Sequence, residues 1–147
     1  MIVKRFLFYF LSFTWGLPMT LIGLLAAAVL ILKGERPTVY GYCIKFSVGK
    51  GWGGISLGMV FITSADASER TSKHEHGHAL QNCLWGFLML FVIGIPSFTR
   101  AQYRKIRYHK HGLQPPTKYD SIWFEGQATR WGTFFIDNLM KKGDCKC

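Results

Sequence analysis

The segment 73–81 reads Lys-His-Glu-His-Gly-His-Ala-Leu-Gln, in which His74, Glu75 and His78 form a His-Glu-x-x-His pattern. On an α-helix, residues four apart lie on the same face, so the two imidazoles can converge on one zinc ion. Glu75 lies about 100° round the helix, where its carboxylate can accept a proton from a water whose pKa the metal lowers. The pattern therefore predicts a helix over about 71–85, with His74 and His78 as zinc ligands and Glu75 as general base.

Two neighbours in this helix are expected to play other roles. His76 lies about 200° from His74 on a helical wheel, so we predict that it is not a ligand. Gly77 costs about 1 kcal/mol relative to alanine in mid-helix, which indicates that another backbone passes close to the metal-binding face. A non-metal explanation stays open, because Ser72-x-x-Glu75 also fits a capping box and a histidine cluster can be a pH-sensitive or adventitious metal patch.

A hydrolytic zinc ion usually has three protein ligands and an open position for water, so the histidines need a third partner. We predict Glu125, which lies in the segment WFEGQATRWG (123–132) of a helix expected from about 120 to 141. Its helix face would also carry three small side chains, which would let the helix press against the histidine helix: Ala128, Thr129 and Gly132. Alternatively, Glu125 is only a favourable charge in a first helical turn. The other candidate ligands are Asp120, Asp137, His109 and His111.

A hydrolase also needs a donor for the oxyanion that develops during the reaction. The sequence does not choose among Tyr119, Tyr103, His109 and Arg130. Before the histidine helix, two strand-like runs, 39–48 and 55–62, flank a glycine-rich segment and predict a β-hairpin. The hairpin either offers a strand edge to an extended peptide or only covers the core.

The N-terminal part of the chain has no charged residue from Phe6 to Leu32. As a helix this run would reach roughly 40 Å, enough to span a bilayer with a bend at Gly16 and Pro18. A cleaved signal peptide is the competing interpretation, but the run is long for one. We therefore predict a transmembrane anchor over 1–36, a metal-binding domain over 37–141 and a polar tail over 142–147.

The apolar segment 86–97 should not cross the membrane, because the histidines and Glu125 can share a metal only on one side. A basic helix is expected from about 97 to 111. The formal charge of +10 is concentrated in residues 100–118, which suits anionic lipid headgroups, and no nucleic-acid motif is present. The four cysteines form no Cys-x-x-Cys pair, which favours a reducing compartment and a cytoplasmic metal site.

His74-Glu75-x-Gly77-His78 with a downstream Glu125-x-x-Ala128 resembles the zincin-like metallopeptidases of the gluzincin kind. The longer pattern, which includes Ile-Pro-Ser at 95–97, is similar to small uncharacterised bacterial membrane proteins of this class. The resemblance covers about residues 38–132 and implies that His74, His78 and Glu125 bind Zn²⁺ and that Glu75 is the general base. It departs from the membrane-anchored gluzincins at Thr129, where they often have an acid. Site-2 proteases, which also use a helical His-Glu-x-x-His, fit less well, since Asp137 would have to supply the third ligand without their Leu-Asp-Gly motif.

The sequence thus predicts an α+β protein of the bacterial cytoplasmic membrane, with a transmembrane helix, a β-hairpin and a mainly helical zincin-like domain. Its expected function is that of a zinc-dependent metallohydrolase acting on a peptide or protein. The alternative is a non-catalytic membrane protein with a structural or vestigial zinc site, which acts as an interaction or immunity-type factor. A third possibility is a basic membrane-surface protein without a metal. The sequence leaves the oligomeric state open.

Overall fold

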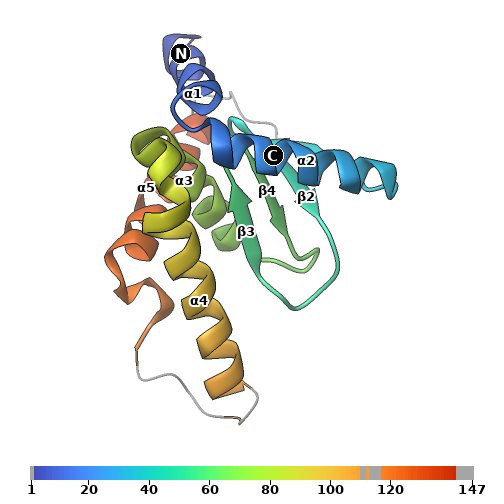
Figure 1. Cartoon of the computed structure of the whole chain (residues 1–147), viewed down its shortest axis with the longest axis vertical. Coiled ribbons are helices and arrows are strands. Elements are labelled where there is room, and N and C mark those ends of the chain that lie inside the picture. The colour runs from blue at the N-terminus through green and yellow to red at the C-terminus, as the bar shows by residue number, and fades with distance from the viewer. Residues whose placement is uncertain (1, 110–111, 113–116, 142–147) are drawn as a thin grey trace.

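The protein is α+β and mostly helical, with one four-stranded sheet (Figure 1). The computed structural model describes residues 2–109, 112 and 117–141. The helices are α1 (Ile2–Phe13), α2 (Leu17–Leu32), α3 (Glu69–Trp85), α4 (Ile95–Arg104) and α5 (Trp123–Lys141). The strands are β1 (Thr38–Tyr40), β2 (Cys43–Ser47), β3 (Gly54–Leu57) and β4 (Val60–Thr63). Short 3₁₀ and π turns are η1 (Gly86–Leu88), η2 (Leu90–Gly94), η3 (Lys105–His109) and η4 (Tyr119–Ser121).

The prediction of a single hairpin is wrong, because the strands form two hairpins within one sheet. Each of the two strand-like runs folds into its own tight hairpin, and the turns lie at Gly41 and Gly58, which have φ values of 61° and 66°. The hairpins join through a parallel pairing of β2 with β4, in which Ile44 lies opposite Val60. The strand order is therefore β1-β2-β4-β3, the glycine-rich segment connects β2 to β3, and β3 is an edge strand.

Helices cover both faces of the sheet. On one face α2 crosses in front of the strands (Figure 1), and Gly23 packs so closely that an added Cβ would overlap the Leu57 carbonyl. On the other face, Lys45 of β2 donates to the hydroxyl of Ser72 in α3 at 2.8 Å. Helix α5 packs against α3, so the layers run in the order α2, sheet, α3, α5. The histidine helix therefore lies between the sheet and the helix that carries Glu125.

The uncharged N-terminal run is not one continuous helix. It forms α1 and α2, which meet at an angle of 90° next to Gly16 and Pro18, where a bend was expected. In the described part of the chain, no single helix is both long and apolar enough to cross a membrane. Two bent pairs have the length and composition, α1 with α2 and the segment 69–88 with 90–107, which is bent by 118°. The transmembrane anchor and the division at residue 36 stay predictions.

The start of α3 excludes the capping-box explanation for Glu75. The helix begins at Glu69, and its N-cap is Ser68, whose hydroxyl accepts from the backbone N–H of Thr71. Ser72 is therefore inside the helix, where it is buried. Glu75 lies in the second turn and is free of a capping role.

The later elements follow the prediction with shifted boundaries. The apolar segment turns back through η1 and η2, so that α4 returns past the cavity that α3 lines. The basic helix is α4 continued by η3, and its expected end at residues 110–111 lies outside the described residues. The final helix begins at Trp123, because residues 119–121 form a 3₁₀ turn first. The predicted polar tail also lies outside the described residues.

Candidate metal centre

Close packing of α3 against α5 brings the two halves of the centre together. A Cβ added at Gly77 would overlap the carbonyl of Ala128, and one added at Gly132 would overlap the carbonyl of Lys73. The expectation that another backbone passes Gly77 is thus confirmed. Small residues on both helices permit this approach, and Glu125 lies one turn before Ala128 on the same face of α5.

The three predicted ligands form one compact group that could hold a metal ion. The Nε2 atoms of His74 and His78 lie 3.1 Å apart, and Oε2 of Glu125 lies 3.0 Å from the first and 3.4 Å from the second. Ligands about 2.0–2.1 Å from a tetrahedral zinc ion lie roughly 3.3–3.4 Å from one another. The Glu125 side chain has no exposed surface, and the side chains of His74 and His78 are 13% and 7% exposed. The triangle therefore fits such an ion almost without rearrangement.

Side chains behind the ligands set the histidine orientations. Nδ1 of His78 lies 2.7 Å from Oε1 of the buried Gln81. The amide nitrogen of Gln81 donates to the Phe124 carbonyl at 2.8 Å and to Gln127 at 2.9 Å, so Oε1 must be the acceptor. His78 then carries its proton on Nδ1, which leaves the Nε2 lone pair for a metal. Nδ1 of His74 lies 2.8 Å from the Thr129 hydroxyl, so the residue that departs from the gluzincin pattern still contacts the first histidine.

The two oxygens of Glu125 have different surroundings. Oε1 accepts a 2.5 Å hydrogen bond from Ser97 of α4. Oε2 is buried and has no well-directed hydrogen bond from any described residue, although both imidazole nitrogens are close. Burial alone would raise the pKa of this carboxyl, but the His74 and His78 imidazoles outweigh it and hold the pKa below its usual range. Glu125 is therefore a carboxylate with one oxygen left for a cation.

Glu75 lies beside the three-ligand group but is not a member of it. Its carboxylate packs against Gly54 of β3, where an added Cβ would approach Oε1 to 2.6 Å. Glu75, His74 and His78 line the same cavity, which has a volume of about 1080 Å³. Burial raises the pKa of Glu75, and the neighbouring His78 and His74 oppose this only in part. A carboxyl in this environment suits proton transfer in the cavity better than metal ligation.

Among the described side chains, Tyr119 is the oxyanion candidate that lines the cavity. Its ring centroid lies 6.2 Å from that of His74. Burial and then the charge of Glu125 raise the pKa of Tyr119 to about 12, so the phenol keeps its proton at neutral pH. Tyr103 and Arg130 are exposed and do not line the cavity. The side chain of His109 lies outside the described residues.

His76 and the alternative third ligands whose side chains the structure describes have partners outside the three-ligand group. His76 is fully buried, as a neighbour and not a ligand: its Nε2 accepts from the backbone N–H of Tyr42 at 3.3 Å, and burial lowers its pKa to about 3. Among the alternative third ligands, Asp137 pairs with Lys73 at 2.6 Å and Asp120 pairs with Arg70. His111 lies outside the described residues.

The sequence interpretation gave no role to two residues that support the ligands, Gln81 and Ser97. Gln81 follows His78 by three positions, a spacing that places the two side chains together on a helix and could have revealed it. Ser97 has no local signal, because its contact with Glu125 depends on how α4 returns. No protein-family model, curated protein or solved structure matches this chain, so the resemblance to gluzincins stays a prediction.

Proposed function

We propose that this protein is a membrane-bound, zinc-dependent metallohydrolase and that it acts as a peptidase of the zincin type. The observation that carries the proposal is the buried triangle of His74, His78 and Glu125, together with Glu75, which lines the same cavity as the two histidines. Two imidazoles and one carboxylate are a usual catalytic zinc set, because they leave a fourth position open. The fourth position would face the cavity that His74 and His78 line.

The side chains of the cavity have complementary tasks in hydrolysis. When bound, zinc would lower the pKa of a water and so supply the nucleophile. Glu75 takes the proton of the attacking water and returns it to the leaving group, and its raised pKa suits both steps. Tyr119, which keeps its proton, donates to the developing oxyanion. Gln81 and Thr129 hold the imidazoles in place while the charge moves.

A peptide substrate is favoured by the position of β3. This strand is at the edge of the sheet, and all of its residues, Gly54–Leu57, line the cavity beside Glu75. An edge strand presents free backbone donors and acceptors, with which an extended peptide can pair. The scissile bond of such a peptide would lie between the strand and the metal ligands.

The proposal is tested by peptide hydrolysis with detergent-purified, zinc-loaded protein and a quenched fluorescent peptide library. Glu75→Gln should keep one zinc per chain and reduce the rate by about 10²–10⁴-fold, since it removes the base and leaves the ligands. Glu69→Gln is the matched control, because it makes the same change on the same helix outside the cavity lining. Equal rates for wild type and Glu75→Gln would instead indicate a non-catalytic zinc protein.

A further inference from the structure

The wall of the cavity has a polar part and an apolar part. Arg70, Gln102 and Asp120 contribute to the polar part. The apolar part comes from α2, β3, the α3–α4 corner and α4, through Met19, Leu57, Met89, Leu90, Ile93 and Phe98. Three of these, Met19, Met89 and Ile93, belong to one buried cluster. His74 and His78 therefore line a cavity with one apolar side, which a substrate would also contact.

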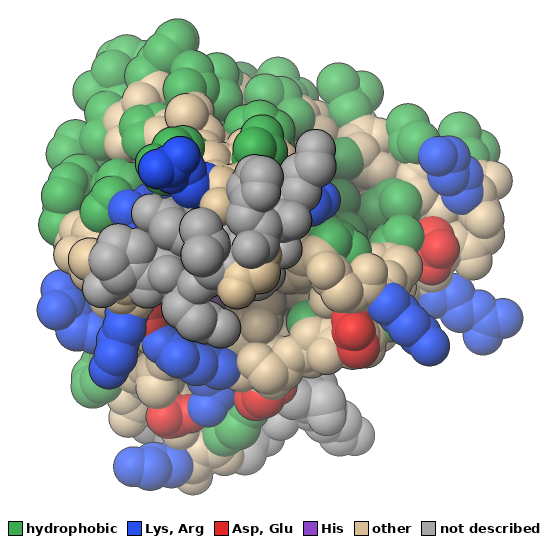
Figure 2. Space-filling view, turned by 90° about the horizontal axis from the view of Figure 1, so that it is seen from below, with side chains coloured by type: hydrophobic (Ala, Val, Ile, Leu, Met, Phe, Trp, Pro, Cys, Tyr) green, Lys and Arg blue, Asp and Glu red, His purple; other side chains and the backbone are tan. Residues whose placement is uncertain are grey.

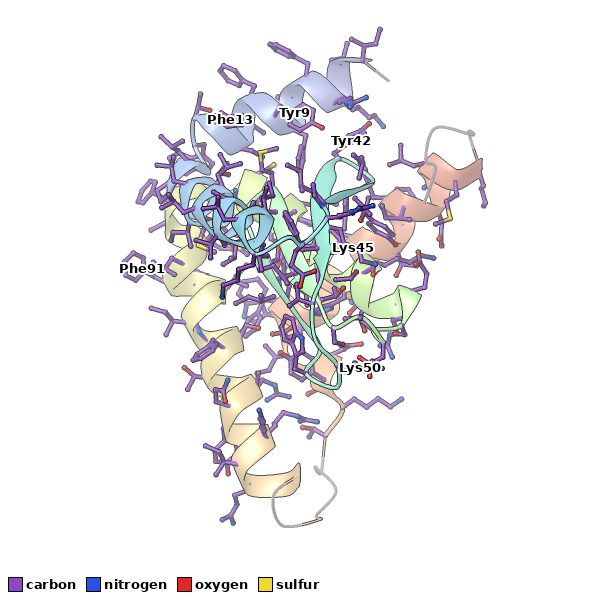
Figure 3. The ribbon with its side chains drawn as sticks, turned by 90° about the vertical axis from the view of Figure 1, so that its right-hand side faces the viewer. Tyr9, Phe13, Tyr42, Lys45, Lys50 and Phe91 are labelled. Atoms are coloured by element: carbon purple, nitrogen blue, oxygen red, sulfur yellow. The ribbon has the colours of Figure 1, made fainter. Side chains whose placement is uncertain are left out.

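The apolar wall continues onto the outside of the molecule. Ile95 and Phe98 line the cavity but are also 51% and 58% exposed. Next to them the α3–α4 corner exposes Phe91, which points away from the ribbon in Figure 3. The corner joins the N-terminal helices through Trp15, whose ring packs against Phe87 with centroids 4.8 Å apart.

These exposed side chains form one surface, which we name the apolar face. It consists of the outward side chains of α1, α2, the α3–α4 corner and the first turn of α4, among them Phe13, Leu21, Leu25, Phe87, Phe91 and Phe98. Figure 2 shows hydrophobic side chains gathered along the upper edge of the molecule and charged side chains spread over its centre, right side and lower part. Contiguous apolar patches of more than a few hundred Å² mark interaction sites.

The charges around the apolar face identify its partner. No charged residue occurs from Phe6 to Leu32 or from Ala79 to Thr99. At three of their four ends the nearest charges are basic: Lys4 and Arg5, Lys33, and Arg100. The fourth end is preceded by His78 and the buried Glu75, which line the cavity and not the outer surface. An apolar face with basic residues at its border is complementary to a bilayer with anionic headgroups. It is less suited to a second copy of this chain, because a two-fold interface would bring like charges together.

We infer that the apolar face is inserted in an anionic bilayer and that the cavity opens at its border, so that the substrate is an apolar segment of a membrane-bound peptide chain. The substrate part of this inference rests on the proposed function, whereas the docking of the face does not. The segment would pass from the lipid along Ile95 and Phe98 to the metal ligands. Its apolar side chains would then contact the Met89 and Ile93 side of the cavity.

The docking is tested with nitroxide labels on the full chain in phosphatidylcholine–phosphatidylglycerol vesicles. Single cysteines replace Leu25, Phe91, Phe98 or Lys50 in a Cys83→Ser, Cys145→Ser, Cys147→Ser background, since Cys43 is buried. Labels at Phe91 and Phe98 should be accessible to oxygen and several-fold protected from a nickel chelate. The label at Lys50, in the exposed loop after β2, should show the reverse.

Two outcomes would overturn the docking. If labels at Phe91 and Phe98 behave like the one at Lys50 while a label at Leu25 reports lipid, α2 alone is in the membrane and the cavity stands clear of it. Protection from both reagents, lost on dilution of the protein, would assign the face to a second copy. Neither measurement needs zinc or hydrolysis, so a failed docking is distinct from a failed peptidase assay.

The substrate class is tested by capture with the zinc-loaded Glu75→Gln protein. A lipid-inserted, leucine-rich peptide with photoreactive leucines should crosslink to the segment 89–98 of this variant. Phe98→Lys should reduce the crosslinking several-fold, because it places a charge where the peptide would enter. Phe134→Lys is the matched control, since Phe134 is 74% exposed on α5 and does not line the cavity. Equal crosslinking of a charged, water-soluble peptide would contradict a substrate from the bilayer.

Discussion

Two buried histidines of helix α3, His78 and His76, have different partners and different roles. On the side toward α5, His78 lies 3.4 Å from the Glu125 carboxylate and is oriented by Gln81. On the side toward the sheet, His76 accepts from the backbone N–H of Tyr42 at 3.3 Å, and its ring lies 6.3 Å from that of Tyr40 of β1. Both histidines are buried. The partners supplied by other elements, and not the sequence motif alone, therefore decide which histidine becomes a ligand.

The pKa values of the two histidines express this difference. Burial alone would lower both, because a charged imidazole is poorly solvated in the interior. Nothing opposes this at His76, whose pKa falls to about 3. At His78 burial is outweighed by the close carboxylate of Glu125 and the charge of Glu75, so the pKa is raised. The surroundings of His78 thus stabilise a positive charge, whereas those of His76 stabilise a neutral side chain in the core.

The largest expected effect comes from removing the carboxylate that distinguishes the ligand side. Glu125→Ala should lose zinc, because two histidines remain without the third ligand or its charge. Zinc affinity can be measured by competition with a chromophoric chelator. Asp137→Ala is the control, since it removes a carboxylate from the same helix that pairs with Lys73. Zinc binding that survives Glu125→Ala but not Asp137→Ala would assign the third ligand to Asp137.

The next largest effect tests the contact between α3 and α5. Gly77→Ala should destabilise the protein by about 1–3 kcal/mol, because the overlap with the Ala128 carbonyl outweighs the gain in helix propensity. Gly94→Ala is the matched control: its Cβ would meet its neighbours at 3.6 Å, and its φ of −57° is helical. Unfolding of both variants in detergent gives the comparison. A Gly77→Ala protein as stable as wild type would mean that the helices are further apart.

Much of this arrangement was predictable from local spacing. His74, Glu75 and His78 identify themselves by their separations along one helix, and Gly77 signals a close neighbour by its cost. Glu125 could be selected because small residues accompany it at helical spacing. The strand pairing was not predictable in this way. Local propensity does not distinguish one hairpin from the two observed hairpins, which turn at Gly41 and Gly58 and join through the parallel pairing of β2 with β4.

A smaller effect is expected from Gln81, which orients His78. Gln81→Leu should weaken zinc binding by about 10–100-fold while His74 and Glu125 stay in place. Gln127→Leu should have less effect, because Gln127 contacts Gln81 and not a ligand in the described structure. Equal zinc affinity of Gln81→Leu and wild type would show that the tautomer of His78 is fixed without this amide.

The smallest effect is a pKa difference in the metal-free protein. His78 should titrate above its ordinary value of 6.5, and Glu125→Gln should lower this pKa, since it removes a negative partner. A raised histidine pKa contributes stability at pH values below 6.5, and this contribution is lost as the pH rises through the folded-state pKa. Zinc must displace the proton, so its affinity should fall as the pH drops through the same pKa. NMR titration of the imidazoles measures both variants, and His76 should stay neutral from pH 5 to 8.

The most direct test of the metal centre is the metal content of the purified protein in three forms: wild type, His78→Ala and His76→Phe. We expect one zinc per chain in wild type and in His76→Phe, since the ring of His76 serves the core, and none in His78→Ala. Wild-type protein without stoichiometric metal, or His78→Ala with wild-type zinc content, would contradict the three-ligand site.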